Sequence, residues 1–561
     1  MTAVRPPLAV VARETLVVLA YVGVSFLYFG RFVASHPGRD VLGSSQDPLI
    51  FIWSFAWWPH ALFHGTNPIV THALFAPQGF NLMWATSVPG LAFAFAPLTW
   101  LAGPVASYNV AMVVLPAAAA WAAYRLCLEL TGSVWASLVG GYLYGFSSYM
   151  VGHELHGHVN LTGVFVVPLL ALVLVRFFRR RLTRRRLAVW LGVLIAFQIS
   201  ISTEVAVAMT LVLALGLALA AVAVAEARPI VRTALAPIVA GYALAVVLLL
   251  PLVIFAFLGF TSTDLSGGAR SGTDLLDALV PTPLNGIAGT LFPSVSAKFE
   301  LEDGLYLGLP ALVIVVLLAW SLRRSAWGRF LLLAFLLLTA ITLGTALRID
   351  GNRIVSLPPR LARHLPALDN VHWDRCAVYL ALCGAVAVAV WTARTPGRIY
   401  PRPFVLPVLA VAAVVPGFWR PYYPSHHDRW PFYTAGLYRS CLRPGEIDLV
   451  FPWGYAGDSM LWQAESGFRF SLAEGYLHAV GAHAPILSGL ERDPVAQELA
   501  NGSQPTMGEL RAFAARNHIA HVIATSTAGY PTARQLRAFG PVQRIGGVFV
   551  APACGRPSLT G

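Results

Sequence analysis

Long apolar stretches recur along the chain as far as Gly417 and alternate with short polar turns. Many of them reach about 18 residues, which is enough to cross the roughly 30 Å hydrocarbon core of a bilayer as a helix. Beyond Gly417 the pattern changes, and a polar helical pattern over Met507–Asn517 leads into the β-branched run Ile519–Ile523. The sequence therefore predicts an all-α polytopic membrane bundle over residues 1–418 and a small soluble α/β domain over residues 419–561.

Clusters of arginine indicate how the predicted helices are oriented. Arg179–Arg181 and Arg184–Arg186 form the strongest cluster, and the N-terminus carries Arg5 and Arg13. Both places are expected in the cytoplasm, because loops rich in lysine and arginine stay on that side. The number of crossings between them must then be even. One apolar segment, Thr86–Gly103, is interrupted by prolines and is therefore assigned to the outer membrane surface.

The remaining apolar segments and the arginines between them alternate in a way that gives about eleven crossings of the plasma membrane. The N-terminus is expected in the cytoplasm, and the C-terminal domain is expected outside. Three outer loops result, over residues 33–103, 260–304 and 347–375. The first contains Phe51–His64, whose tryptophans follow a helical pattern typical of an amphipathic helix at the membrane surface.

Composition supports a membrane protein, since 57% of the 561 residues are apolar and only 12% are charged. The net charge of +13 would suit a protein that binds nucleic acid. However, the arginines lie at helix ends, so membrane lipid is the expected partner and nucleic acid is not. Cys441 and Cys554 bracket the soluble domain. A disulfide between them and two free thiols are equally acceptable, because the sequence does not give their separation.

Ionisable residues collect at the outer ends of the predicted spans, whereas the spans themselves are almost free of charge. They are Asp40, Asp47, His153, Glu154, His156, His158, Glu204, Glu300, Glu302, Asp303, Asp369, His372, Asp374 and Arg375. An ion-coupled transporter would bury such groups near the midplane and would show repeated halves. The pattern therefore favours a site at the outer interface.

The order of these features resembles the GT-C superfamily of membrane glycosyltransferases, and the resemblance covers most of residues 10–395. It rests on Gln46-Asp47-Pro48-Leu49, Phe75–Leu82, Gly103–Asn109, Gly152–Asn160, and Glu302 before Tyr306-Leu307-Gly308. The resemblance implies a GT-C-like helical fold and transfer of a sugar from a polyprenyl-phosphate donor. The acceptor would be a glycan, a lipid or a protein outside the cell.

The resemblance also implies roles for individual residues. A sugar hydroxyl is a poor nucleophile, so a carboxylate must take its proton; Asp47 is the expected base and Asp40 the second candidate. The departing lipid phosphate requires a cation, for which Arg375 is expected, with Arg363 or Arg360 as substitutes. Further residues expected to bind substrate are His156, His158, Asn160 and Glu302.

Each of these assignments has a plainer alternative. Asp47 could simply cap a helix that begins at Pro48, and Asp40 suits a turn. Arg375 could anchor a helix end in lipid headgroups. Glu302 could be a solvated loop carboxylate.

The run His153–His158 lacks the zinc-peptidase spacing, so the sequence assigns no metal ligand. A divalent cation stays an open alternative as cofactor. Two other functions also remain open: a non-catalytic carrier or flippase for lipid-linked sugars, and an envelope assembly protein.

Overall fold

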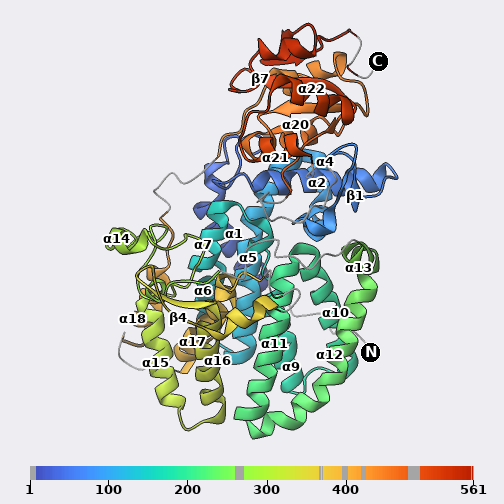
Figure 1. The fold of residues 1–561 in the computed structure, drawn as a ribbon. Coiled ribbons are helices and arrows are strands. Elements are labelled where there is room, and N and C mark those ends of the chain that lie inside the picture. Colours follow the sequence, from blue (N-terminus) through green and yellow to red (C-terminus); the bar gives the residue numbers. More distant parts are fainter. Residues whose placement is uncertain are drawn as a thin grey trace.

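The computed structural model describes residues 8–258, 271–364, 368, 371–394, 402–417, 425–477, 493–556 and 559. Figure 1 shows a bundle of helices with a smaller mixed domain at its upper end. In the described part, six helical segments are long and apolar enough to cross a membrane. They are Leu8–Tyr28, Pro104–Thr131, Val159–Phe178, Thr203–Ala223, Ala225–Leu248 and Asp374–Arg394. The protein is therefore a multi-pass membrane protein, and the number of eleven crossings stays a prediction.

Helix α5 (Pro104–Thr131) lies at the centre of the bundle and packs against α1 (Leu8–Tyr28), α6 (Val134–Gly145), α9 (Val166–Phe178) and α17 (Ala377–Arg394). The C-terminal half of α5 carries buried alanines, which let neighbouring helices approach closely. The other bundle helices are α10 (Arg184–Ile201), α11 (Thr203–Ala223), α12 (Arg228–Leu248), α13 (Leu250–Phe257), α15 (Leu309–Leu322), α16 (Ala326–Thr342) and α18 (Arg402–Ala413).

The segment between α1 and α5 forms the upper surface of the bundle. It contains α2 (Pro48–Phe63), β1 (Val70–Thr71), β2 (Phe80–Asn81), α3 (Pro89–Ala94) and α4 (Ala96–Ala102). Helices α3 and α4 are too short to cross a membrane, as the prolines predict.

The prediction of an amphipathic surface helix at Phe51–His64 is wrong. In α2, Trp53 is 0% exposed and Trp58 is 2% exposed, and only the last turn, with Leu62 and Phe63, is exposed, so the helix does not present one continuous exposed face. The reason is that the C-terminal domain covers the side of α2 that the sequence pattern suggested to be exposed. Trp53 Nε1 donates to Oε1 of Gln463 in the C-terminal domain at 2.7 Å.

The C-terminal domain contains a five-stranded sheet of order β6-β5-β7-β9-β8. The strands are β5 (Ile447–Phe451), β6 (Ser471–Leu472), β7 (Ile519–Thr525), β8 (Gln543–Ile545) and β9 (Val548–Ala551). β5 is parallel to β6 and β7, whereas β9 is antiparallel to β7 and β8. The accompanying helices are α19 (Pro431–Thr434), α20 (Ser459–Glu465), α21 (Pro494–Ala500) and α22 (Met507–Arg516). The domain is thus a mixed α/β unit.

Parts of this domain follow the sequence pattern closely. The predicted helix over 507–517 is α22, and Thr506 begins it with a capping box to Glu509. The β-branched run Ile519–Ile523 lies in β7, and β8 and β9 form a hairpin beside it. Cys441 and Cys554 form a disulfide, which settles the alternative left open by the sequence. The predicted boundary at 418/419 lies outside the described residues.

The core of the C-terminal domain continues into the upper surface of the bundle. Buried residues of α2, of α20 and of the sheet belong to one hydrophobic cluster. Gln463 reinforces the contact, since its Nε2 donates to the carbonyl oxygen of Ala73 at 2.7 Å. This junction is where the candidate site lies.

Candidate functional site

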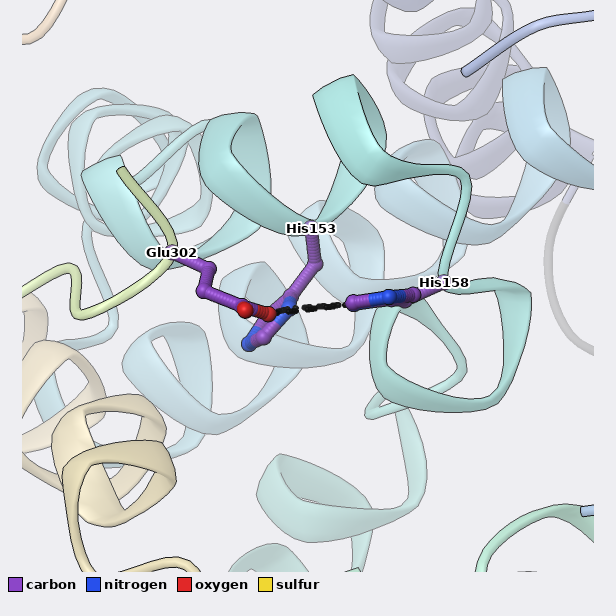
Figure 2. A group of neighbouring side chains, drawn as sticks. All are labelled: His153, His158 and Glu302. Carbon is purple, nitrogen blue, oxygen red and sulfur yellow. Dashed lines mark hydrogen bonds and ion pairs between the residues drawn. The ribbon is translucent and has the colours of Figure 1, made fainter. Parts of the chain in front are cut away.

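Four ionisable side chains from separate segments meet at the upper end of the bundle. Asp47 precedes α2, His153 lies on α7 (Ser148–His156), His158 precedes α8 (Val159–Thr162), and Glu302 lies in the loop before α15. His158 Nε2 is 2.7 Å from Asp47 Oδ2. On the other side of its ring, His158 Nδ1 is 3.2 Å from both His153 Nδ1 and Glu302 Oε2. Figure 2 shows His153, His158 and Glu302 pointing toward one another.

Two glycines let these segments come so close. Gly152 packs against the loop that carries Glu302, and a Cβ on Gly152 would lie 2.8 Å from Glu302 Cα and in collision with the carbonyl oxygen of Leu301. Gly157 ends α7 with φ of 76°, a left-handed conformation that glycine adopts without strain. The turn at Gly157 directs the chain back, so that His158 faces both Asp47 and His153.

The C-terminal domain contributes a further residue that the sequence did not predict. Tyr476 follows β6, and its hydroxyl donates to Asp47 Oδ1 at 2.6 Å. Asp47 is thus held through both oxygens, by His158 and by Tyr476. No motif marks Tyr476, because its partner lies 429 positions earlier in the chain.

The environment fixes the charges of Asp47 and His158. Burial alone would raise the pKa of Asp47, but the hydrogen bonds from His158 and Tyr476 hold it below its usual value. Burial alone would lower the pKa of His158, whereas its hydrogen bonds to Asp47 and Glu302 raise it. Asp47 is therefore ionised at neutral pH, and the carboxylates around His158 favour positive charge on its ring.

The pKa values of Glu302 and His153 are both lowered, whereas that of His158 is raised. Burial would raise the pKa of Glu302, but hydrogen bonds from His153 and His158 bring it far below its usual value. Burial lowers the pKa of His153 to about 3, and the nearby charge of Arg375 contributes to this. His153 is therefore neutral at physiological pH and can offer a ring nitrogen as a ligand.

The donor atoms of His153, His158 and Glu302 fit a metal ion. Their separations of 3.2, 3.2 and 3.4 Å form a nearly equilateral triangle. Tetrahedral zinc with bonds of about 2.0–2.1 Å places its ligands about 3.3–3.4 Å apart. Two histidines and one carboxylate also form a known catalytic zinc set with an open fourth position. Asp47 on the outer nitrogen of His158 matches the carboxylate that orients a metal-bound histidine.

The other predicted site residues are arranged around this group. His156 Nδ1 donates to the carbonyl oxygen of Gly152 at 2.9 Å, and its ring stacks on that of His158. Asn160 is buried in α8. Asp40 faces His36 and His426 at 3.6 Å each, so its described ion pairs are separate from those of Asp47.

The predicted phosphate-binding arginines have different outcomes. Arg375, just before α17, forms an ion pair with Glu204 at the start of α11. Arg360 is exposed and donates to Ser356. The side chain of Arg363 lies outside the described part of the chain. The capping alternative for Asp47 is wrong, because its side chain makes no hydrogen bond to the first turn of α2.

Solved structures share the fold of this chain. The arabinofuranosyltransferase AftD from Mycobacteria matches with a TM-score of 0.58 and 16% identity, covering 92% of this chain and 35% of that chain. The oligosaccharyltransferase from Archaeoglobus fulgidus in the apo form matches with a TM-score of 0.52 and 12% identity, covering 91% and 69%. These are GT-C glycosyltransferases, so the predicted GT-C fold is confirmed. The chain spans about a third of the length of AftD.

The sequence itself gives the family. Residues 16–415 match the model of a domain of unknown function, DUF6311, and the chain belongs to that family. No curated protein matches the sequence.

Proposed function

We propose that the protein is a membrane glycosyltransferase that moves a sugar from a polyprenyl-phosphate donor to an acceptor at the end of the bundle where Asp47 lies. The GT-C fold supports this class of reaction. The observation that carries the proposal is the position of Asp47, whose two oxygens are held by His158 and Tyr476 where bundle and C-terminal domain meet. Glycan, lipid and protein acceptors are all compatible with this site.

In the proposed reaction, Asp47 takes the proton of the acceptor hydroxyl while the hydroxyl oxygen attacks the anomeric carbon. The bond from that carbon to the lipid phosphate breaks, so the configuration at the anomeric carbon inverts. Asp47 suits this task because it is ionised at neutral pH, and each of its oxygens keeps a lone pair beyond its present hydrogen bond. His158 and Tyr476 fix its orientation.

The leaving phosphate requires positive charge nearby. His153, His158 and Glu302 would hold a divalent cation, which would supply that charge when bound. Arg375 adds a second positive group, although Glu204 balances part of its charge. We infer from the arginine clusters that the site faces the outside of the cell.

The alternative is a carrier, flippase or envelope assembly protein with the same fold. Such a protein would have no need of a base at position 47. A strain that lacks the gene should lose one linkage from its envelope glycans and should accumulate the lipid-linked donor. Wild-type protein should restore the linkage, and Asp47→Asn should fail to restore it although it reaches the membrane in equal amount.

A matched control is Asp350→Asn, which removes a partly exposed carboxylate from an ion pair with Lys298. Exposed pairs contribute little to stability, so this variant should restore the linkage fully. Full restoration by Asp47→Asn would remove the base from the mechanism. Unchanged glycans and lipid-linked sugars in the deletion strain would remove glycosyl transfer altogether.

A further inference from the structure

Two cavities meet at the end of the bundle opposite to Asp47. One has a volume of about 410 Å³ and the other about 760 Å³, and Leu130 and Arg179 line both. Helix α5 runs from the end of the bundle with Asp47 to the end with the cavities. Tyr108 near its start contacts the turn at Gly157, and Glu129 near its end lines the smaller cavity. At 1.5 Å per residue these positions are about 30 Å apart, which is the thickness of a bilayer core.

The smaller cavity is strongly basic. Four arginines line it against one glutamate: Arg125, Arg176, Arg179 and Arg181, with Glu129. Glu129 accepts from Arg176 Nε at 3.1 Å and from Arg181 Nη1 at 2.6 Å, and it also pairs with Arg179 Nη1 at 3.4 Å. Arg125 Nη1 pairs with Glu14 at 3.2 Å. A guanidinium has five N–H donors, and these ion pairs engage one guanidinium nitrogen of each of the four arginines. The cavity is therefore preorganised for a further anion of phosphate type.

The larger cavity is an apolar groove between α9, α11, α16 and α17. Along α11 its lining runs from Met209 to Ala220, and along α9 from Val167 to Phe178. Eleven residues of helix correspond to about 16 Å, which is half the thickness of the bilayer core. Its charged lining residues, Arg179 and Glu226, lie near the arginine end.

We propose that the two cavities together bind one anionic phospholipid from the leaflet on the arginine side. The phosphate lies among the four arginines, and the acyl chains lie in the groove. The length of the groove favours a lipid of that leaflet over the donor, whose phosphate belongs at the opposite end. Basic pockets between membrane helices are suited to such headgroups. This inference is independent of the reaction at Asp47.

The headgroup is tested with purified full-length protein in detergent. Added phosphatidylglycerol should raise the midpoint of thermal unfolding more than phosphatidylcholine does, and native mass spectrometry should detect the retained lipid. Arg176→Gln with Arg181→Gln should weaken the apparent affinity roughly 30-fold, about fivefold for each arginine. The control is Arg184→Gln with Arg185→Gln, an equal charge change outside the cavity, which should leave the affinity unchanged.

The groove is tested with a side chain that fills it. Gly216 lines the groove, and a Cβ there meets nothing within 4 Å, so Gly216→Leu should fold and should prevent lipid retention. Gly23→Leu on α1 is the matched control, because Gly23 also has nothing within 4 Å and does not line the groove. Lipid retention by Gly216→Leu equal to that of wild type would overturn the proposal. So would equal stabilisation by inorganic phosphate, or retention of a polyprenyl phosphate in place of phospholipid.

Discussion

Glu302→Gln removes one charged ligand from the triangle with His153 and His158 and preserves the size of the side chain. We expect the wild-type protein to bind Zn²⁺ and this variant to bind it far more weakly. The three donor atoms already lie 3.2 to 3.4 Å apart, so binding needs almost no rearrangement. Without the carboxylate only two imidazoles remain, whereas catalytic zinc sites have three protein ligands.

The expected loss of zinc affinity can be bounded by comparison with Asp47, which contacts the ligand His158 rather than the metal. Asp47 touches the outer nitrogen of His158, and removal of such a partner typically costs about 10–100-fold in metal affinity. Loss of a ligand should exceed that, so Glu302→Gln should lose more than about 100-fold. Since Asp47 and Glu302 raise the pKa of His158, protons compete with the metal. Affinity should therefore fall about tenfold per pH unit below that pKa.

The assay is equilibrium dialysis of the purified full chain against buffered Zn²⁺, with chelator competition. Glu154→Gln is the matched control. Glu154 is fully buried on the same helix as His153, and burial raises its pKa well above its usual value, so it is neutral and close in shape to glutamine. Equal affinity in wild type and Glu302→Gln would refute the metal centre. An equal loss in Glu154→Gln would show that the effect is a general disturbance of the fold.

Three further substitutions test how the site is held. Tyr476→Phe removes a hydrogen bond to a charged group, worth about 1.5–3 kcal/mol, so the pKa of Asp47 should rise and the acid limb of the pH–rate profile should move to higher pH. Gly152→Ala should displace the Glu302 loop and cost about 1–3 kcal/mol of stability in denaturant titration, with weaker Zn²⁺ binding. Gln463→Ala should cost about 1–3 kcal/mol for each buried group left unpaired, measured by thermal unfolding.

The bundle could be predicted from sequence wherever one pattern decides the outcome. The long apolar runs that predict membrane spans near 204–226 and 376–394 form α11 and α17, because a long apolar run has no stable alternative to a helix in the membrane. The prediction of a surface helix at Phe51–His64 is wrong because the sequence pattern does not show what covers the helix. A helix with tryptophans on one face looks amphipathic, and only the contact of α2 with Gln463 reveals a second covering partner.

The candidate site could be predicted only in part. Asp47, His158 and Glu302 were assigned from motifs of the superfamily, and the structure brings them together. His153 belongs to the same polar run, yet its place as a third donor follows from the turn at Gly157 rather than from residue spacing. Tyr476 lies in a segment without a recognisable motif. Such tertiary contacts leave no local periodicity in the sequence.

The contact between Tyr476 and Asp47 also decides which experiments on the C-terminal domain are informative. Truncation after Gly417 would remove Tyr476 from the base and Gln463 from Trp53, and would expose the tryptophans of α2. Loss of function would then follow whether the domain carries its own activity or only completes the site in the bundle. Tyr476→Phe separates the two cases, because the domain stays in place and one hydroxyl is lost. A shift of the pH profile without loss of protein would show that the domain acts through Asp47, whereas an unchanged profile would indicate that its role lies elsewhere.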